Sequence, residues 1–335
     1  MGISGAWKTQ LGKESSAGTA VAATIIWRGP AGHISDDRET LRVAEDIGIL
    51  IPTIRDTTPK LAASISLPET DLTFEQAQYI SNAGIQGVAG VQDGAGSDYI
   101  YTSEVGYTAA RTLYTYTVES GDDTQAEEME YGFVRAFNLK GTGGGVLKVS
   151  SDWSGRQASL ASFTGALSVP AVRPVYAAGT IYIDDDSGNV GTTPVSAGNI
   201  IGIELAVNTG WETKYFIDTG QKYFQVIYFN KEAFSGTLKV VFEHATLAET
   251  EKAKWRANTA RLIRLKFPGA ALVTPGTTYS TLLYMLDMAG SYTKFNPLSS
   301  QNGNSIIEAE FSLGYSSAEA LALKTVVVNE LSALP

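Results

Sequence analysis

Runs of β-branched and aromatic residues alternate with polar residues along most of the chain, and glycine, asparagine or aspartate bounds many of them. A period of two is typical of half-buried strands, because successive side chains point to opposite faces of a sheet. The sequence therefore predicts a mainly β protein. The clearest predicted strands are 61–67, 113–118, 132–139, 146–150, 201–207, 223–229, 238–242, 280–286 and 306–313.

Only two segments favour helices, and both begin with a pattern typical of a capping box. Thr73-Phe-Glu-Gln76 and Thr246-Leu-Ala-Glu249 place a Thr hydroxyl three residues before a Gln or Glu side chain. The two side chains can then satisfy amides that lack partners at a helix start. We expect one short helix after each sequence, which makes the predicted class α+β with little α.

The order strand, helix, strand, strand, strand occurs twice, first from 61–67 and again from 238–242. Two prolines in Val169-Pro170-Ala-Val-Arg-Pro174 interrupt the chain between the two sets. This predicts a first domain at 1–170 and a second at 171–335, both large enough for a core. Identities between the sets are few, so a true duplication and a chance match both stay open.

A glycine-rich segment at 84–111 separates the first helix from the next strand. Segments of this length are either mobile or functional. One interpretation is a floppy surface loop. The other is an arm that contacts a neighbouring subunit through the apolar anchors Tyr99, Ile100 and Tyr101, with Trp7 as a further candidate for such a contact.

Candidate chemistry is sparse. The chain has no cysteine and only two histidines, which disfavours disulfides, thiolate metal sites and histidine-based triads. Asp184-Asp-Asp186 lacks the ligand spacing of a calcium loop, and Gly141-Thr-Gly-Gly-Gly145 lacks the Lys and the following helix of a phosphate loop. Both are interpreted as turns. We expect no catalytic, cofactor-binding or metal-binding residues, and no enzyme activity.

The charge balance excludes a class of partner. A formal net charge of −10 and a pI near 4.8 disfavour a protein that grips nucleic-acid phosphates. An acidic wall could still surround DNA without adhering to it. The sequence shows neither a signal peptide nor an apolar run long enough to span a membrane, so no membrane span is expected.

Several short motifs occur in order along nearly the whole chain, and none of them is chemically diagnostic alone. By these motifs the chain resembles the tail tube proteins, or major tail proteins, of long-tailed siphovirus-type bacteriophages. The motifs are Ala6-Trp-Lys-Thr-Gln-Leu-Gly-Lys-Glu14, Gly18-Thr-Ala20, Glu45-Asp-Ile-Gly48, Tyr116-Thr-Val-Glu-Ser-Gly-Asp122, Glu127-Glu-Met-Glu-Tyr-Gly132, Ser151-Asp-Trp-Ser-Gly-Arg-Gln157, Ile181-Tyr-Ile-Asp184, Asn208-Thr-Gly-Trp211 and Val326-Val-Val-Asn-Glu330.

The resemblance implies a fold and an assembly. Each domain would be a β-sandwich or half-barrel with one short flanking helix, and inner strands would join into a β-lined ring. Family members with one tube domain form hexameric rings, and members with two can form trimers with pseudo-sixfold symmetry. If the internal repeat is real, trimeric rings are expected here; hexameric rings are the alternative.

The resemblance also implies a function. The chain would be a structural subunit of the virion tail, assembled in the host cytoplasm into stacked rings through which double-stranded DNA passes unbound. Its other partners would be the tape measure, tail tip and terminator proteins. Two alternatives stay open: a β-sandwich carbohydrate-binding or adhesin-like virion protein, and a tail-terminator or capsid-associated ring protein.

Overall fold

Strands dominate the structure, a computed structural model that describes residues 4–51, 53–169, 171–187 and 189–334. Half of the chain is in strands and 7% is in two α-helices, which confirms the mainly β prediction. All ladders are antiparallel, and among the described residues they form no closed circuit, so the sheets stay open. A short 3-10 helix, η1 (Ser4–Ala6), precedes the first strand.

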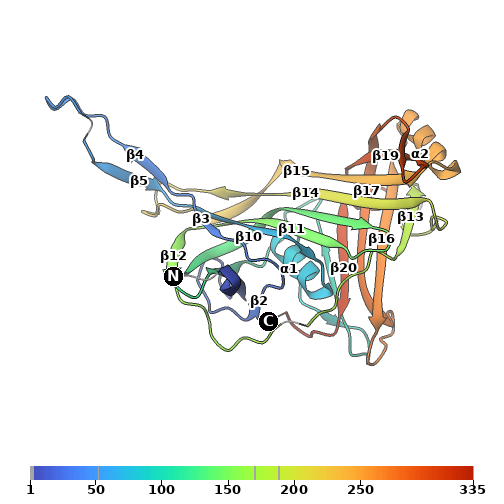
Figure 1. The fold of residues 1–335 in the computed structure, drawn as a ribbon, viewed down its shortest axis with the longest axis horizontal. Helices are drawn as coiled ribbons and strands as arrows, with labels where there is room; N and C mark the ends of the chain where they lie inside the picture. Colours follow the sequence, from blue (N-terminus) through green and yellow to red (C-terminus); the bar gives the residue numbers. More distant parts are fainter. Residues whose placement is uncertain (1–3, 52, 170, 188, 335) are drawn as a thin grey trace.

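A small N-terminal sheet has the strand order β2–β1–β9–β10–β12 (Figure 1). Only the first part of the long strand β10 belongs to it. The bounds are β1 (Lys8–Lys13), β2 (Ile25–Ile26), β9 (Tyr116–Gly121), β10 (Ala126–Thr142) and β12 (Ala158–Ala161).

The second part of β10 belongs to a long central sheet with the order β3–β6–β11–β10–β14–β15–β19. This sheet continues onto the end of β17. Its further strands are β3 (Ile34–Asp36), β6 (Ala63–Asp71), β11 (Lys148–Gly155), β14 (Ile200–Lys214), β15 (Val226–Glu243), β17 (Thr281–Phe295) and β19 (Asn304–Leu313). The predicted strands 223–229 and 238–242 are therefore two parts of one strand, β15.

A third sheet starts from the first part of β17 and has the order β13–β16–β17–β20–β8–β7. A separate short strand, β18, forms a hairpin with β19. The bounds are β7 (Val91–Gln92), β8 (Tyr99–Glu104), β13 (Thr180–Asp185), β16 (Arg261–Ala271), β18 (Ser299–Gln301) and β20 (Leu323–Asn329).

Both predicted helices are present, but only one has its predicted cap. In α1 (Phe74–Gly84) the Thr73 hydroxyl accepts a hydrogen bond from the Gln76 amide, at 3.2 Å. In α2 (Thr246–Arg256) the N-cap is Ala245, without a side-chain hydrogen bond, so the predicted capping box there is wrong. Glu249 instead lies 3.0 Å from the His244 ring.

The two helices occupy different positions in the molecule (Figure 1). Nearly all of α1 is buried between the central sheet and the third sheet, where it contacts β10, β17 and β20. The amphipathic α2 covers the end of the molecule at β17, with Trp255 against Phe295 at 5.5 Å between ring centroids. One continuous hydrophobic cluster contains residues of both halves of the chain, from Leu11 to Val328.

The segment 84–111 is not a structureless loop. It contains β7 and β8, and β8 pairs with β20 near the end of the chain. The Asp93 carboxylate accepts hydrogen bonds from the Thr278 and Tyr279 amides, at 2.7 and 2.8 Å. The interpretation as a floppy loop is therefore wrong, because non-local pairing orders a stretch whose composition is typical of a loop.

The strand pairings occur twice in the same pattern. In the first half β1 pairs β9, β9 pairs β10, β10 pairs β11 and β12, and β11 pairs β6, which pairs β3. In the second half the corresponding pairs are β13–β16, β16–β17, β17–β19, β17–β20, β19–β15 and β15–β14. Each half also has its helix directly after β6 or β15. The predicted seam at 169–174 includes Pro170, which lies outside the described residues.

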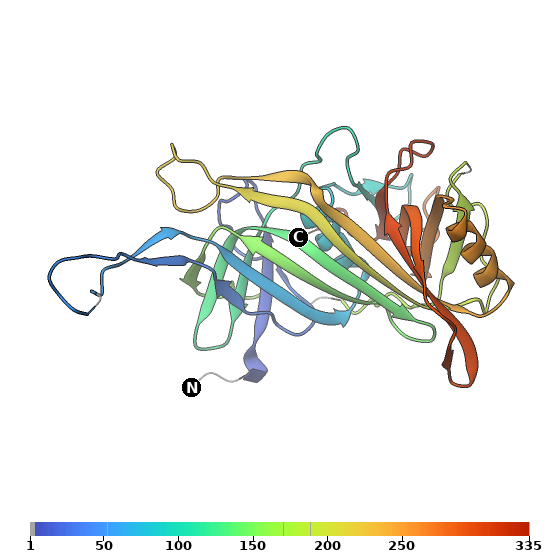
Figure 2. The same cartoon turned by 90° about the horizontal axis from the view of Figure 1, so that it is seen from above.

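The repeat extends to the hairpin before each helix. Ile65 pairs with Ile34 and Leu238 pairs with Leu205, and all four side chains are buried on the core face of the central sheet. The hairpins enclosed by these pairs, 35–64 and 206–237, differ in length by only two residues. Figure 2 shows both hairpins projecting at the same end of the molecule.

Candidate assembly surfaces

The central sheet has one buried face and one polar face. Along β10, Phe137 and Leu139 are buried, whereas Asn138 and Lys140 between them are exposed. The same alternation holds in β11, β14, β15 and β19, because each strand places successive side chains on opposite faces. We call the exposed side the polar face.

Charged residues on the polar face lie in one row across neighbouring strands. Cross-strand register places Lys140 opposite Glu204, Glu204 opposite Lys239, and Lys239 opposite Glu310. Two of these carboxylates form ion pairs of 3.8 Å, Lys239 with Glu204 and Lys294 with Glu310. From edge to edge this charge row consists of Asp71, Lys148, Lys140, Glu204, Lys239, Glu310 and Lys294.

The rows beside the charge row carry small, mostly uncharged side chains. One of them consists of Ser150, Asn138, Ala206, Thr237, Ser312 and Ser291. Lys140 and Lys148 face each other, but each also faces an acid on its other side, Glu204 and Asp71, so opposite charges largely cancel along the row. The polar face is therefore hydrated and chemically bland.

The two ends of the central sheet have open strand edges. At one end β3 pairs only with β6, and at the other the last residues of β17 and the hairpin strand β18 pair only with β19, among the described ladders. Open edges offer unpaired amide and carbonyl groups to another strand. Within the chain, β10 and β14 join the two halves by such an edge pairing.

The first-half hairpin forms an arm that extends away from the body (Figures 1 and 2). Its strands are β4 (Glu39–Arg42) and β5 (Asp56–Lys60). Arg42 makes a bidentate ion pair with Asp56, at 2.8 and 2.9 Å, and this lowers the pKa of the Asp56 carboxyl. The tip beyond this pair exposes aliphatic side chains: Val43, Ile47, Ile49, Leu50, Ile51 and Ile54.

An exposed aliphatic cluster at the tip of a two-stranded hairpin is unusual for a protein that stays alone. Leu50 has 103% of its reference surface exposed and Ile54 has 91%. Contiguous apolar surface of this kind marks interaction sites. This arm was not predicted from the sequence; the signal for it was Ile47-Gly-Ile-Leu-Ile51, an aliphatic run that no strand of the body accounts for.

The corresponding hairpin of the second half has one side of its tip docked, although Phe216 and Ile217 at the turn are exposed. Phe224, at the tip of β14–β15, is buried against Tyr131 and Phe133 of β10, with ring centroids 5.0 and 6.2 Å away. The Tyr215 hydroxyl donates to the Leu61 carbonyl, and the Leu61 amide donates to the Lys222 carbonyl. The first half thus covers one side of the tip of the second-half hairpin.

Arg156, the first residue after β11, fixes this docked tip. Its guanidinium donates to the carbonyls of Phe224 and Gly18, both at 2.9 Å, and of Gln225 at 3.2 Å. It also lies 4.7 Å from the ring centroid of Tyr131. Burial raises the pKa of the Tyr131 hydroxyl.

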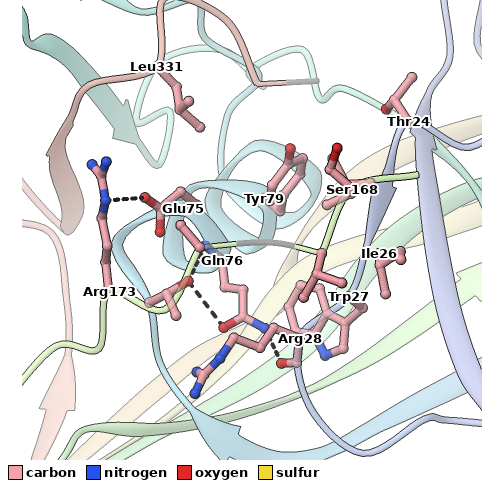
Figure 3. Close-up of a pocket in the computed structure, with 14 residues that line it drawn as sticks. Thr24, Ile26, Trp27, Arg28, Glu75, Gln76, Tyr79, Ser168, Arg173 and Leu331 are labelled. Carbon is pink, nitrogen blue, oxygen red and sulfur yellow. Dashed lines mark hydrogen bonds and ion pairs between the residues drawn. The ribbon is translucent and has the colours of Figure 1, made fainter. Parts of the chain in front are cut away.

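A mostly apolar pocket of about 230 Å³ lies between α1 and the segment around β2 (Figure 3). Trp27 and Arg28 face Glu75 and Tyr79 of α1, and Arg173 lies 4.0 Å from the Glu75 carboxylate. Burial raises the pKa of the Glu75 carboxyl. Its polar lining groups include the Glu75 carboxylate and the hydroxyls of Thr24, Thr73 and Ser168.

Of the four predicted contact residues, three are accessible in different degrees and one is not. Trp7 is 48% exposed, with its ring edge on His33 at 4.5 Å. Tyr99 and Ile100 are half-buried in β8. Tyr101 is 1% exposed and its hydroxyl donates to the Leu331 carbonyl, so the expectation that Tyr101 is an exposed anchor is wrong.

The interpretations of the acidic and glycine-rich motifs as turns agree with the local hydrogen bonds. The Asp184 carboxylate accepts from the amides of Gly191, Thr192 and Thr193, and the Gly145 amide donates to the Thr142 carbonyl. The described residues include no group of three or more acidic or histidine side chains placed to hold a metal ion.

Two further observations concern the chain as a whole. Within the ranges that the structure describes, neither helix has the length and apolar character needed to cross a membrane. Neither the protein-family models nor the curated proteins compared with this chain gave a match.

Proposed function

We propose that the chain is a structural subunit of a bacteriophage tail tube that assembles into stacked rings around a channel for genome delivery. The observation that carries the proposal is the twofold repeat of pairings, in which β10 and β14 already join two halves through one continuous sheet. A contact between unlike surfaces that can be repeated from copy to copy generates a ring when the rotation closes.

The open edges supply the repeated contact. In the twofold repeat, the second part of β10 corresponds to the edge formed by the end of β17 and by β18. In the same repeat, β14 corresponds to β3. If the β17–β18 edge of one copy paired with β3 of the next copy, the central sheet would continue around the ring. Because each chain contributes two halves, trimeric rings with pseudo-sixfold symmetry are proposed.

The polar face suits the wall of a channel. Its paired charges and small side chains give DNA nothing to bind, and the acidic balance of the whole chain opposes adsorption. The resemblance to siphovirus tail tube proteins supplies the biological setting of the proposal. That setting is the virion tail, with tape measure, tail tip and terminator proteins as further partners.

Electron microscopy of the purified, concentrated protein tests the proposal, with native mass spectrometry of any rings. We expect tubes of uniform diameter and rings of three chains. Rings that never stack would favour the terminator alternative, and six chains per ring would contradict the trimer. A protein that stays monomeric at every concentration, also when tail tip protein is added, would overturn the function.

A further inference from the structure

The chain makes one hairpin contact internally and leaves its counterpart open. One side of the β14–β15 tip docks on the first half, whereas the hairpin of similar length in the first half, the arm, ends in exposed aliphatic residues. We propose that the arm of one copy docks on the second half of a neighbouring copy, in the same way that the β14–β15 tip docks on the first half. This inference rests on the ring proposed above.

The repeat identifies the receiving surface. In the first half the tip is held by Arg156, directly after β11, and by Leu113, three residues before the cross-strand pair of Tyr116 with Gly132. In the second half Gly314 directly follows β19, so it corresponds to Arg156. Arg261 pairs with Gly290 there, as Tyr116 pairs with Gly132 in the first half. Asn258 lies three residues before Arg261 and therefore corresponds to Leu113.

That second-half surface is uncovered and partly aromatic. Asn258 and Gly314 are exposed, and Ser291 is half-exposed. Beside Gly314, Tyr315 stacks on Tyr107 with ring centroids 5.2 Å apart, although about half of each side chain remains in solvent. A stacked pair of exposed tyrosines is a typical anchor for an apolar partner. We call these five residues the acceptor surface.

The two surfaces complement each other. The arm tip offers Ile49, Leu50 and Ile51, which are flexible aliphatic side chains without hydrogen-bonding groups. The acceptor surface offers aromatic rings beside a glycine, without a charged side chain of its own. In the internal contact Tyr223 lies 5.0 Å from the Arg156 guanidinium, and counting from the buried pairs at the two hairpin bases places Ile51 within one residue of the position of Tyr223. Ile51 is therefore expected close to Gly314 of the next copy.

The same neighbour would also supply the open sheet edge. A copy that offers its β3 edge to the end of β17 also carries the arm, because β3 begins the hairpin. The copy that offers the end of β17 also carries the acceptor surface, because Gly314 follows the strand paired with β17. One interface therefore contains both contacts, and the occupant of the acceptor surface is a second copy of this chain.

Cross-linking tests the contact, since the chain has no cysteine of its own. We would combine Ile51→Cys with Gly314→Cys and treat assembled protein with a short bismaleimide. Ile51 is exposed, and an added side chain at Gly314 meets only the Gly290 backbone at 3.8 Å, so both changes should leave folding intact. We expect covalent dimers and closed ring-sized products on denaturing gels.

Matched controls separate the outcomes. Ile217→Cys, at the exposed tip of the second hairpin, combined with Gly314→Cys should give no ring-sized product, and neither should single-cysteine variants. Tubes that form normally but cross-link only between rings, or not at all, would overturn the docking and leave the tube proposal standing. If wild-type protein forms neither rings nor tubes, the proposed function itself fails.

A second measurement does not depend on cysteine placement. The triple variant Ile49→Ser, Leu50→Ser, Ile51→Ser removes the aliphatic tip, and Ile217→Ser is its control on the other hairpin. We expect the triple variant to stay folded as a monomer and to need at least tenfold more protein for assembly. Assembly at the wild-type concentration would contradict the inference.

Discussion

At the scale of residues, Arg156 holds the docked side of the β14–β15 tip against the first half. Its guanidinium reaches three carbonyls, two of them at the docked hairpin tip. Arg156→Ala should lower the free energy of unfolding by about 2–4 kcal/mol, because hydrogen bonds from a charged donor are lost and buried carbonyls stay unpaired. Urea denaturation measures this loss.

The matched variants for Arg156 examine geometry and position. Arg156→Lys keeps the charge but loses the planar fork, so we expect most of the same loss. Arg38→Ala removes an exposed arginine in a surface ion pair and should change stability by less than about 0.5 kcal/mol. Full stability of Arg156→Lys would mean that charge alone holds the tip.

Asp98 gives a prediction about pH. Its carboxylate is fully buried, and neither oxygen has a hydrogen-bond partner among the described residues. Burial, with the nearby charges of Asp93 and Glu330, raises the pKa of Asp98. Below the ordinary carboxyl pKa both the folded and unfolded states are protonated, so this group costs stability only as the pH rises through that range.

Asp98→Asn should therefore raise the thermal midpoint at pH 7 and change it little at pH 3.5. The reason is that the amide cannot ionise, so the folded state no longer carries the cost of a buried charge. Thermal unfolding at several pH values between 3.5 and 8 measures the difference. An equal change at both pH values would show that packing rather than charge is responsible.

At the scale of elements, the two helix N-termini differ in capping, because α1 has a side-chain N-cap hydrogen bond and α2 has none. Thr73→Ala removes a hydroxyl that accepts from the Gln76 amide and should cost about 1 kcal/mol. Ala245→Ser supplies a hydroxyl at an extended N-cap that has none and should gain about 0.5–1 kcal/mol. Urea denaturation of both variants measures these changes, and a loss in Ala245→Ser would contradict the capping argument.

The elements also show which features of the fold are local enough to be predicted. Nine predicted strands and both helices match real elements because alternation and capping are properties of adjacent residues. β8 was missed because its strand character comes from β20, more than two hundred residues away. The role of the arm likewise depends on the hairpin of the other half, and Tyr101 was misjudged because only the fold reveals its burial.

At the scale of the whole molecule, the charge row determines how the polar face meets DNA. Glu204→Lys with Glu310→Lys would leave Asp71 as the one acidic residue of the row. We expect wild-type protein to leave the mobility of double-stranded DNA unchanged, and the variant to retard it with an affinity that falls steeply with salt. A gel-shift series between 50 and 200 mM salt measures both.

The control for this prediction places the same charges elsewhere. Glu39→Lys with Asp218→Lys changes two exposed acids at the hairpins, away from the charge row. If this control retards DNA as strongly as the row variant, net charge rather than the row decides the outcome. If the wild-type protein itself binds DNA, the polar face is not a neutral wall.

The two corresponding hairpins have a consequence for how such a protein can evolve. In a ring of identical single repeats, every substitution appears at every position, so a tip and its receiving surface must change together. Here the aromatic tip at Phe224 serves the internal contact, and the aliphatic tip at Ile49–Ile51 is free to serve another. The internal contact always meets its partner at high effective concentration. Selection can therefore tune the strength of the external contact without weakening the fold of the single chain.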